Sequence, residues 1–199
     1  MSDLVTGFDL DMTLIDSRPG IRAVYDRLAH ETGAPIDSEL VVSRLGPPLE
    51  TELANWFSSD RVDEMADRYR ALYAELALPL IEPLPGALDA LAAAREFGRA
   101  IVITAKSGRH AFSHARPLGF DAEEVFGGVW RLGKADVLTD QDARIYVGDH
   151  IHDMDAATAA GVTGVGVTTG PSSADELSEH GAAVVLGSLA EFPGWLSSR

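Results

Sequence analysis

The sequence predicts an α/β fold, a Rossmann-like parallel sheet with helices on both faces, plus an inserted α-helical subdomain. Short apolar, β-branched segments alternate with helical segments along most of the chain, which is typical of a parallel sheet covered on both sides. One long connection near the N-terminus breaks this alternation, because it has the apolar spacing of several amphipathic helices and no strand. A length of 199 residues fits one core domain with such an insert.

The first predicted strand is Leu4–Asp9. A helical pattern then runs from about residue 20 to residue 78 and ends in a proline-rich segment, Leu78–Gly86. A helix follows over Ala87–Phe97, and Gly98 closes it. The later predicted elements are a strand at Arg99–Thr104, a helix near Gly108–Arg116, and short strands at Val125–Trp130, Arg144–Val147, Val162–Val167 and Ala183–Leu186.

The domain boundaries follow from this pattern. We expect the α/β core to comprise residues 1–15 and 83–199, and the helical insert to comprise residues 16–82. Such an insert can be an excursion packed only for stability. Its position after the first strand favours a lid over the carboxyl edge of the sheet, where open α/β sheets bind ligands.

Acidic residues outnumber basic residues by 31 to 16, for a net charge of −15. A surface with this charge repels nucleic-acid backbones and anionic membranes, so we expect neither as a partner. There is no cysteine, no apolar run reaches the roughly 18 to 20 residues of a membrane span, and no signal-peptide pattern opens the chain. We therefore expect a cytoplasmic protein in which an anionic substrate needs a local positive centre.

Two aspartates stand at the end of the first predicted strand. Residues two apart in a strand face the same side, so Asp9 and Asp11 can converge on one point. A second pair follows the strand that runs into Gly148, with Asp149 at its end and Asp153 one helical turn later. If the two strands are neighbours, these oxygens form a site suited to Mg²⁺.

Other interpretations of these residues are open. Asp153 and Asp155 also fit as acidic residues in the first turn of a helix, where the helix dipole favours them. His150 and His152 have an H-x-H spacing that suits zinc, but the absence of cysteine and the surrounding carboxylates favour a substrate contact or a plain loop role.

Two further strand ends carry groups that can bind phosphate. Thr104 ends the strand "IVIT", and its hydroxyl and the backbone N–H groups that follow, beginning with Ala105, can donate to a phosphate oxygen. Lys134 follows the strand predicted at Val125–Trp130. Alone, each of these residues is commonplace; their order along the chain is the informative feature.

In that order the residues resemble the haloacid dehalogenase (HAD) superfamily of phosphatases. "DLDMT" (Asp9–Thr13) is similar to its first motif, D-x-D-x-[TV], and "GDHIHD" (Gly148–Asp153) to its fourth, G-D-x-x-x-D. Thr104 stands in the place of the serine or threonine of the second motif, and Lys134 in the place of the lysine of the third. The resemblance implies that the helical insert is the α-helical cap of this family.

Within the predicted cap, "RLGPPLE" (Arg44–Glu50) is similar to the G-P-P-L loop of phosphoglycolate-phosphatase-like members. This implies that Arg44 and Pro47 contact the substrate, although the same sequence would also make an ordinary helix–helix turn. The branch often has T-N-K at the second motif, where this chain has Thr104-Ala105-Lys106, and K-P-x-P at the third, where Lys134 precedes "ADVL".

The resemblance implies a Mg²⁺-dependent hydrolase of small phosphomonoesters, phosphoglycolate-like, that works through an aspartyl-phosphate. Asp9 would be the nucleophile, and Asp11 would protonate the leaving alkoxide and then deprotonate water. Mg²⁺ would be held by Asp9, the backbone carbonyl of Asp11 and Asp149. Thr104, Ala105 and Lys134 would bind phosphoryl oxygens, and Asp153 would support the metal or the lysine.

Several alternatives are open on the same residues. They are a phosphomutase of the same fold, 5′-nucleotidase or pyrophosphatase specificity, and a catalytically silent phosphate-binding regulator. A receiver-type signalling domain lacks the large helical insert, and "GVTGVGVTTG" has no G-x-G-x-x-G that opens a helix, which disfavours dinucleotide binding. The expected partner is a small phosphorylated metabolite, and the expected assembly is a monomer or homodimer.

Overall fold

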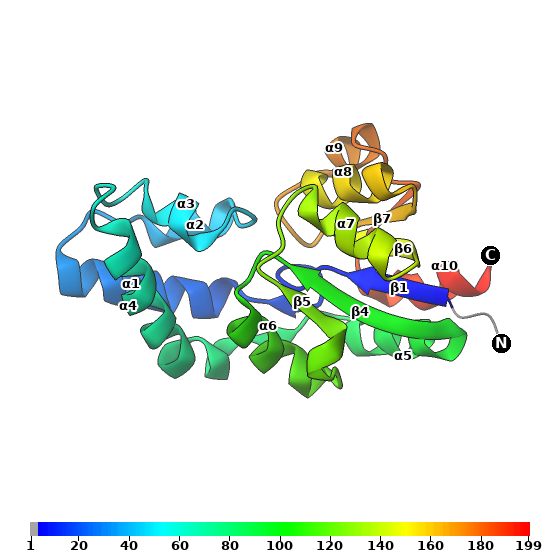
Figure 1. The fold of residues 1–199 in the computed structure, drawn as a ribbon, viewed down its shortest axis with the longest axis horizontal. Coiled ribbons are helices and arrows are strands. Elements are labelled where there is room, and N and C mark those ends of the chain that lie inside the picture. The colour runs from blue at the N-terminus through cyan, green and yellow to red at the C-terminus, as the bar shows by residue number, and fades with distance from the viewer. Residues whose placement is uncertain (1–3) are drawn as a thin grey trace. The chain divides into compact units, whose positions relative to one another are not determined.

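The computed structural model describes residues 4–199, and its largest feature is a six-stranded parallel sheet in the order β5-β4-β1-β6-β7-β8 (Figure 1). The predicted fold class is confirmed. The strands are β1 (Leu4–Phe8), β4 (Gly98–Thr104), β5 (Val125–Gly127), β6 (Ala143–Gly148), β7 (Thr163–Val167) and β8 (Val184–Leu186).

The chain divides into two compact units, Met1–Ile15 with Pro83–Arg199, and Asp16–Glu82. The first unit contains the sheet. Two short strands that the sequence pattern did not predict, β2 (Ile15–Asp16) and β3 (Glu82–Pro83), pair where the chain passes from one unit to the other.

The second unit is helical. Its apolar positions, three and four residues apart, bury the faces of Tyr25, Leu28, Leu53 and Leu72 in a core of its own. Its helices are α1 (Arg18–Thr32), α2 (Ser38–Ser43), α3 (Leu49–Leu53) and α4 (Val62–Leu76), followed by the 3₁₀ turn η1 (Leu78–Leu80).

Helices cover both faces of the sheet in the first unit. Helices α7 and α8 lie on one face, and α5 and α10 lie on the other (Figure 1). Phe8 of β1 packs edge-on against Phe192 of α10, and both side chains are fully buried. The helices are α5 (Ala87–Phe97), α6 (Gly108–Ala115), α7 (Gly133–Asp140), α8 (Ile151–Ala160), α9 (Ala174–Glu179) and α10 (Phe192–Ser197), with 3₁₀ turns η2 (Arg116–Leu118), η3 (Ala122–Glu124) and η4 (Leu189–Glu191).

One strand is shorter than the sequence pattern predicts. Strand β5 ends at Gly127, not at Trp130, because the chain turns at Gly128, which has φ 75°. The backbone N–H of Gly128 donates to the carbonyl oxygen of Lys106 at 2.8 Å, and that of Val129 donates to the carbonyl of Thr104 at 2.9 Å. The loop after β5 is thereby tied to the end of β4.

None of the helices within residues 4–199 has both the length and the apolar character that are needed to cross a bilayer.

Gly86, at the start of α5, allows a close approach between two segments. It has φ 82°, and a Cβ added there would lie 2.1 Å from the backbone nitrogen of Ala190. We expect Gly86→Ala to destabilise the fold by more than about 2 kcal/mol, because the backbone of η4 must move in addition to the strained φ. The measurement is chemical denaturation.

The matched control is Gly161→Ala. Gly161 has φ 67° but has no atom within 4 Å of an added Cβ, so this variant carries only the backbone strain, about 1 kcal/mol. Equal losses of stability in the two variants would show that the contact with Ala190 is unimportant.

Candidate active site

The carboxyl ends of three neighbouring strands bring the predicted residues together. Strand β1 lies between β4 and β6, with Phe8 in register with Val102 on one side and Val147 on the other. Asp9 follows β1 directly, and its backbone N–H donates to the carbonyl of Val147 at 2.8 Å. Because β1 is the strand at which the sheet order reverses, this edge is the place where α/β sheets bind ligands.

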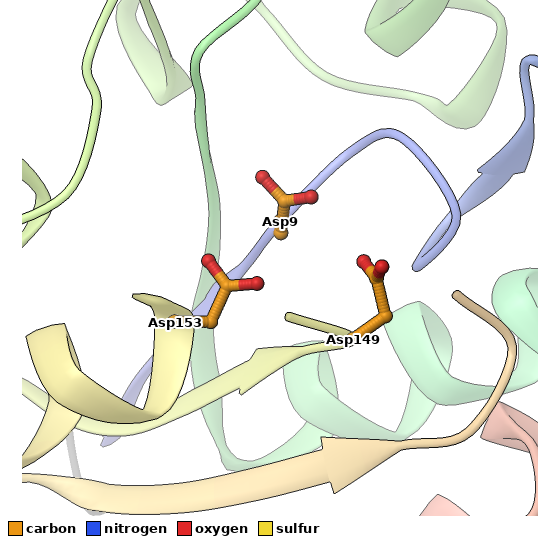
Figure 2. A group of neighbouring side chains, drawn as sticks. All are labelled: Asp9, Asp149 and Asp153. Atoms are coloured by element: carbon orange, nitrogen blue, oxygen red, sulfur yellow. The ribbon is translucent and has the colours of Figure 1, made fainter. Parts of the chain in front are cut away.

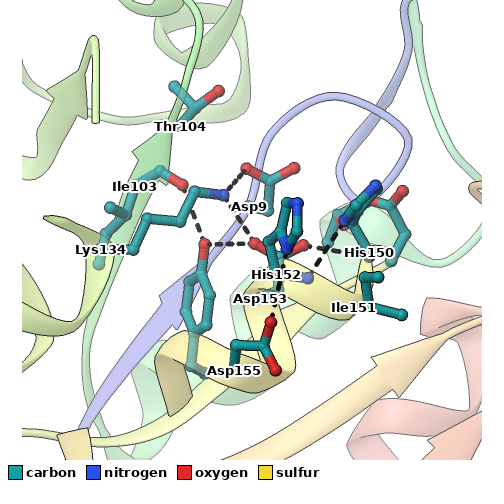
Figure 3. A network of polar contacts seen from close by, with 12 residues as sticks. Asp9, Ile103, Thr104, Lys134, His150, Ile151, His152, Asp153 and Asp155 are labelled. Carbon is teal, nitrogen blue, oxygen red and sulfur yellow. Dashed lines mark hydrogen bonds and ion pairs between the residues drawn. The ribbon is translucent and has the colours of Figure 1, made fainter. Parts of the chain in front are cut away.

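Lys134 is the centre of the polar network. It lies in the first turn of α7, and its ammonium group contacts Asp9 Oδ1 at 2.8 Å and Asp153 Oδ1 at 2.7 Å (Figure 3). All three side chains are buried. Lys134 therefore ties the loop after β5 to the end of β1 and to the start of α8.

Asp153 is held by further donors. The Tyr146 hydroxyl donates to Asp153 Oδ1 at 3.2 Å and also lies 3.1 Å from the carbonyl oxygen of Ile103. The backbone N–H of His150 donates to Asp153 Oδ2 at 3.1 Å, which closes the first turn of α8. Both oxygens of Asp153 are thus engaged by the protein itself.

Asp149 lies beside this network. Its Oδ1 accepts a hydrogen bond from the Thr13 hydroxyl at 2.7 Å, and its Oδ2 lies against Gly170, where an added Cβ would be 1.7 Å away. Asp9, Asp149 and Asp153 can each offer a carboxylate oxygen such that the three oxygens lie within 4.8 Å of one another (Figure 2). An all-oxygen donor set of this size fits a hard divalent cation.

Burial and charge shift the pKa values of this cluster. Burial raises the pKa of Asp9 to about 7, with Asp153 and Asp11 adding to the rise and Lys134 opposing it. Burial, then the charges of Asp9 and Asp153, raises the pKa of Asp149 well above its usual range. Burial opposes charge on Lys134, but the two carboxylates outweigh it and raise the pKa of the lysine.

Lys106 connects Asp11 and Thr104 in a second group of polar contacts. Lys106 Nζ forms an ion pair with Asp11 Oδ1 at 3.0 Å, and both side chains are largely shielded from solvent. The buried Thr104 hydroxyl accepts a hydrogen bond from the backbone N–H of Lys106 at 3.2 Å, so the turn through Ala105 folds over the end of β4. Each of the two first-motif aspartates therefore has its own lysine.

The two histidines near the site do not form a zinc cluster with the acids in the described part of the chain. His150 caps α8, with its Nδ1 accepting from the backbone N–H of His152 at 3.1 Å. His152 Nδ1 lies 3.4 Å from Asp155 Oδ2, and the two imidazole rings are 4.6 Å apart.

Arg44 and Pro47 lie in the helical unit. Arg44, directly after α2, forms a two-point ion pair with the buried Glu52, at 3.1 and 2.7 Å, and lies over the ring of Trp56. Pro47 is in the loop that leads to α3. The guanidinium of Arg44 is thus held in one orientation within its own unit.

Sequence reasoning missed two contributors to the site and left the role of a third, Lys106, open. Tyr146 lies within β6 and has the pattern of an ordinary core residue, and Gly170 lies in a loop with no motif. Lys106 follows the second motif, but its contact with Asp11 depends on the turn between them. Only Lys106 carried a signal, as a charged residue next to a strand that ends in a phosphate-binding type of side chain.

Two protein-family models match the chain. The model described as haloacid dehalogenase-like hydrolase matches residues 7–122, and one described as HAD-hydrolase-like matches residues 130–192. These segments include Asp9, Thr104, Lys134, Asp149 and Asp153.

Curated relatives include the tyrosine-protein kinase PtkA of Mycobacterium tuberculosis, 31% identical over 193 residues, and the 5′-nucleotidase of Pseudomonas aeruginosa, 31% identical over 195 residues. The matches cover 89% and 87% of this chain. The chain spans 66% of the length of PtkA and 86% of the nucleotidase.

Solved structures share the fold. A haloacid dehalogenase-like hydrolase from Streptococcus pneumoniae matches with a TM-score of 0.84 and 24% identity, over 97% of this chain and 98% of its own. A predicted phosphoglycolate phosphatase from Haemophilus somnus matches with a TM-score of 0.82 and 21% identity, over 98% of each chain. The family match over more than half of the residues, together with the fold, shows that this chain belongs to the haloacid dehalogenase-like hydrolase family.

Proposed function

We propose that this chain is a Mg²⁺-dependent phosphatase of small phosphomonoesters that works through an aspartyl-phosphate on Asp9. The observation that carries the proposal is an imbalance of charge. Asp9, Asp149 and Asp153 are buried together, and Lys134 supplies one positive charge against three carboxylates. Buried carboxylates are stable as anions only beside compensating charge, so the cluster favours a divalent cation.

The chain's own residues support an in-line displacement. Asp9 lies at the strand end with one carboxylate oxygen held by Lys134, which leaves Oδ2 for attack on phosphorus. As that O–P bond forms, the ester P–O bond breaks and Asp11 gives its proton to the leaving oxygen. Asp11 then takes a proton from water, whose oxygen attacks phosphorus, and phosphate leaves from Asp9.

Thr104 and the backbone N–H groups near Ala105 would bind phosphoryl oxygens at the end of β4, and Lys134 would shield the charge of Asp9. Asp9, the Asp11 carbonyl and Asp149 would hold Mg²⁺, which supplies charge neutralisation for the approach of one anion to another. Because both oxygens of Asp153 accept hydrogen bonds, we assign it the role of holding Lys134.

Residues 16–82 are proposed as a cap that selects the substrate, with Arg44 and Pro47 as contacts. The support is the resemblance of "RLGPPLE" to a substrate loop and the fixed orientation of Arg44. Phosphoglycolate-like esters are the first class of substrate that we propose. The named relatives add nucleoside monophosphates as a second class to be assayed.

The proposal predicts release of inorganic phosphate from p-nitrophenyl phosphate with Mg²⁺ and loss of that activity with EDTA. Asp9→Asn should lower kcat by more than about 10³-fold, because an amide cannot attack phosphorus. Asp136→Asn, an exposed site on α7, is the control and should behave as wild type. A folded Asp9→Asn protein with wild-type turnover would refute the nucleophile. With a sugar phosphate in place of p-nitrophenyl phosphate, isomerised substrate without phosphate release would indicate a mutase.

The raised pKa of Asp9 predicts how metal and pH affect stability. The metal-free fold keeps a proton on Asp9 up to about pH 7, whereas an unfolded carboxyl loses it near pH 4. Stability contributed by this group is therefore full at low pH and is lost as pH rises from about 4 to about 7, by at most about 4 kcal/mol.

Thermal denaturation with EDTA should accordingly give a Tm that falls from pH 5 to pH 8. Mg²⁺ binds the ionised carboxylates, so its increase in Tm should be larger at pH 8 than at pH 5. Asp9→Asn should flatten the metal-free profile. A Mg²⁺ effect that is independent of pH would contradict the assignment.

The space beside Asp149 gives another prediction. In Gly170→Ala, the new methyl group would overlap Asp149 Oδ2 and turn the carboxylate away from Asp9. We expect at least about tenfold weaker Mg²⁺ binding by calorimetry, the range for a disturbed ligand environment. Gly194→Ala, in α10, has open space around its Cβ and no positive φ, and is the control; unchanged Mg²⁺ affinity in Gly170→Ala would remove Asp149 from the ligand set.

A further inference from the structure

The loop between β5 and α7, residues 128–132, holds an arginine that the mechanism above does not use. Arg131 has φ 52°, in the left-handed region that residues other than glycine rarely adopt. Such a conformation persists only where surrounding contacts maintain it, and it is common at functional sites.

Two contacts fix the Arg131 side chain. Its guanidinium carbon lies 4.7 Å from the centroid of the Trp130 ring, and its Nε donates to His152 Nε2 at 3.3 Å. The Trp130 and His152 rings meet edge to face at 6.0 Å. Neither terminal amino group of Arg131 has a hydrogen bond or ion pair with another residue in the range 4–199.

A chain of hydrogen bonds orients this arginine. Arginine is always a donor, so His152 accepts at Nε2 and carries its proton on Nδ1, which lies 3.4 Å from Asp155 Oδ2. The other oxygen of Asp155 lies 2.7 Å from His180 Nδ1. The guanidinium of Arg131 is thus held through residues of α8 and of the segment after α9. Its terminal N–H groups remain available to bind a ligand.

The arginine lies next to the catalytic network. Lys134 follows Arg131 by three residues, and its backbone N–H donates to the Arg131 carbonyl at 2.9 Å. The ammonium group of Lys134 binds Asp153, and the guanidinium of Arg131 binds His152, the preceding residue on α8. Figure 3 shows His152 and Asp153 together at the start of α8, beside Asp9.

We propose that Arg131 binds a second anionic group, a carboxylate or a further phosphate, on the leaving portion of the substrate. Trp130 and His152 are its positioning residues. A planar guanidinium binds such groups through two parallel N–H···O bonds, and its fixed orientation lowers the cost of binding. The inference rests on the proposed phosphatase function and defines its substrate class as small phosphoesters that carry two anionic groups.

The kinetic test compares substrates with and without the second anion. Arg131→Gln should lower kcat/KM about ten- to a hundredfold for 2-phosphoglycolate, because charge-assisted hydrogen bonds are lost, and less than about threefold for ethyl phosphate. Arg131→Lys keeps the positive charge but lacks the paired N–H donors of a guanidinium, so its kcat/KM for 2-phosphoglycolate should lie between those of wild type and Arg131→Gln. Arg144→Gln, an exposed arginine near the start of β6, is the matched control for net charge and should change neither value.

A bisphosphate of similar length separates the two sources of the anion. The substrate whose kcat/KM falls more in Arg131→Gln carries the anionic group that Arg131 binds. His152→Ala should reduce the preference for doubly anionic substrates in the same direction, because Arg131 loses the acceptor for its Nε.

Binding is measured separately by calorimetry on Asp9→Asn, with and without Arg131→Gln. The second change should weaken binding of 2-phosphoglycolate or the bisphosphate about tenfold or more, and that of ethyl phosphate much less. Equal losses for all ligands, or no loss for the doubly anionic ones, would overturn the subsite even in an active phosphatase. Selective loss of binding in a protein that hydrolyses no phosphoester would sustain the subsite and reject the phosphatase.

Discussion

The buried ammonium group of Lys134 is the interaction on which the rest of the site depends. It contacts Asp9 and Asp153 at 2.8 and 2.7 Å, and these three groups come from different parts of the chain. A charged group removed from water at such a position costs several kcal/mol unless its partners are in place. The end of β1 and the first turns of α7 and α8 must therefore be aligned together.

The same arrangement explains how an acidic protein can bind an anionic substrate. With a net charge of −15, the surface as a whole repels phosphate. Two positive charges lie at the carboxyl edge of the sheet, Lys134 beside Asp9 and Lys106 beside Asp11. Since the carboxylates still exceed the lysines, a divalent cation completes the local balance in the proposed mechanism, so that phosphate does not meet an excess of negative charge at this edge.

The sequence was sufficient for the parts of the site that stand at strand ends. Asp9, Thr104 and Asp149 each follow an apolar, β-branched run, and the alternation of strands and helices implies one sheet edge for all three. It was not sufficient where a role depends on side-chain direction. Tyr146 has the pattern of a core residue, yet its hydroxyl holds Asp153, and nothing around Gly170 indicates that Asp149 needs the space beside it.

The end of β5 shows the same limit at the level of the backbone. The apolar run through Trp130 predicts a longer strand, but positive φ at Gly128 turns the chain early. That turn places Arg131 and Lys134 three residues apart, where Lys134 contacts the proposed nucleophile and Arg131 contacts the neighbouring residue of α8. Because the Asp9 carboxylate is contacted by Lys134 and the Arg131 guanidinium contacts His152 instead, a change at residue 131 can alter which ester binds without altering the groups that act on phosphorus. The proposed roles of Arg131 in binding the ester and of Lys134 in contacting Asp9 are thus separated by only three residues along the chain.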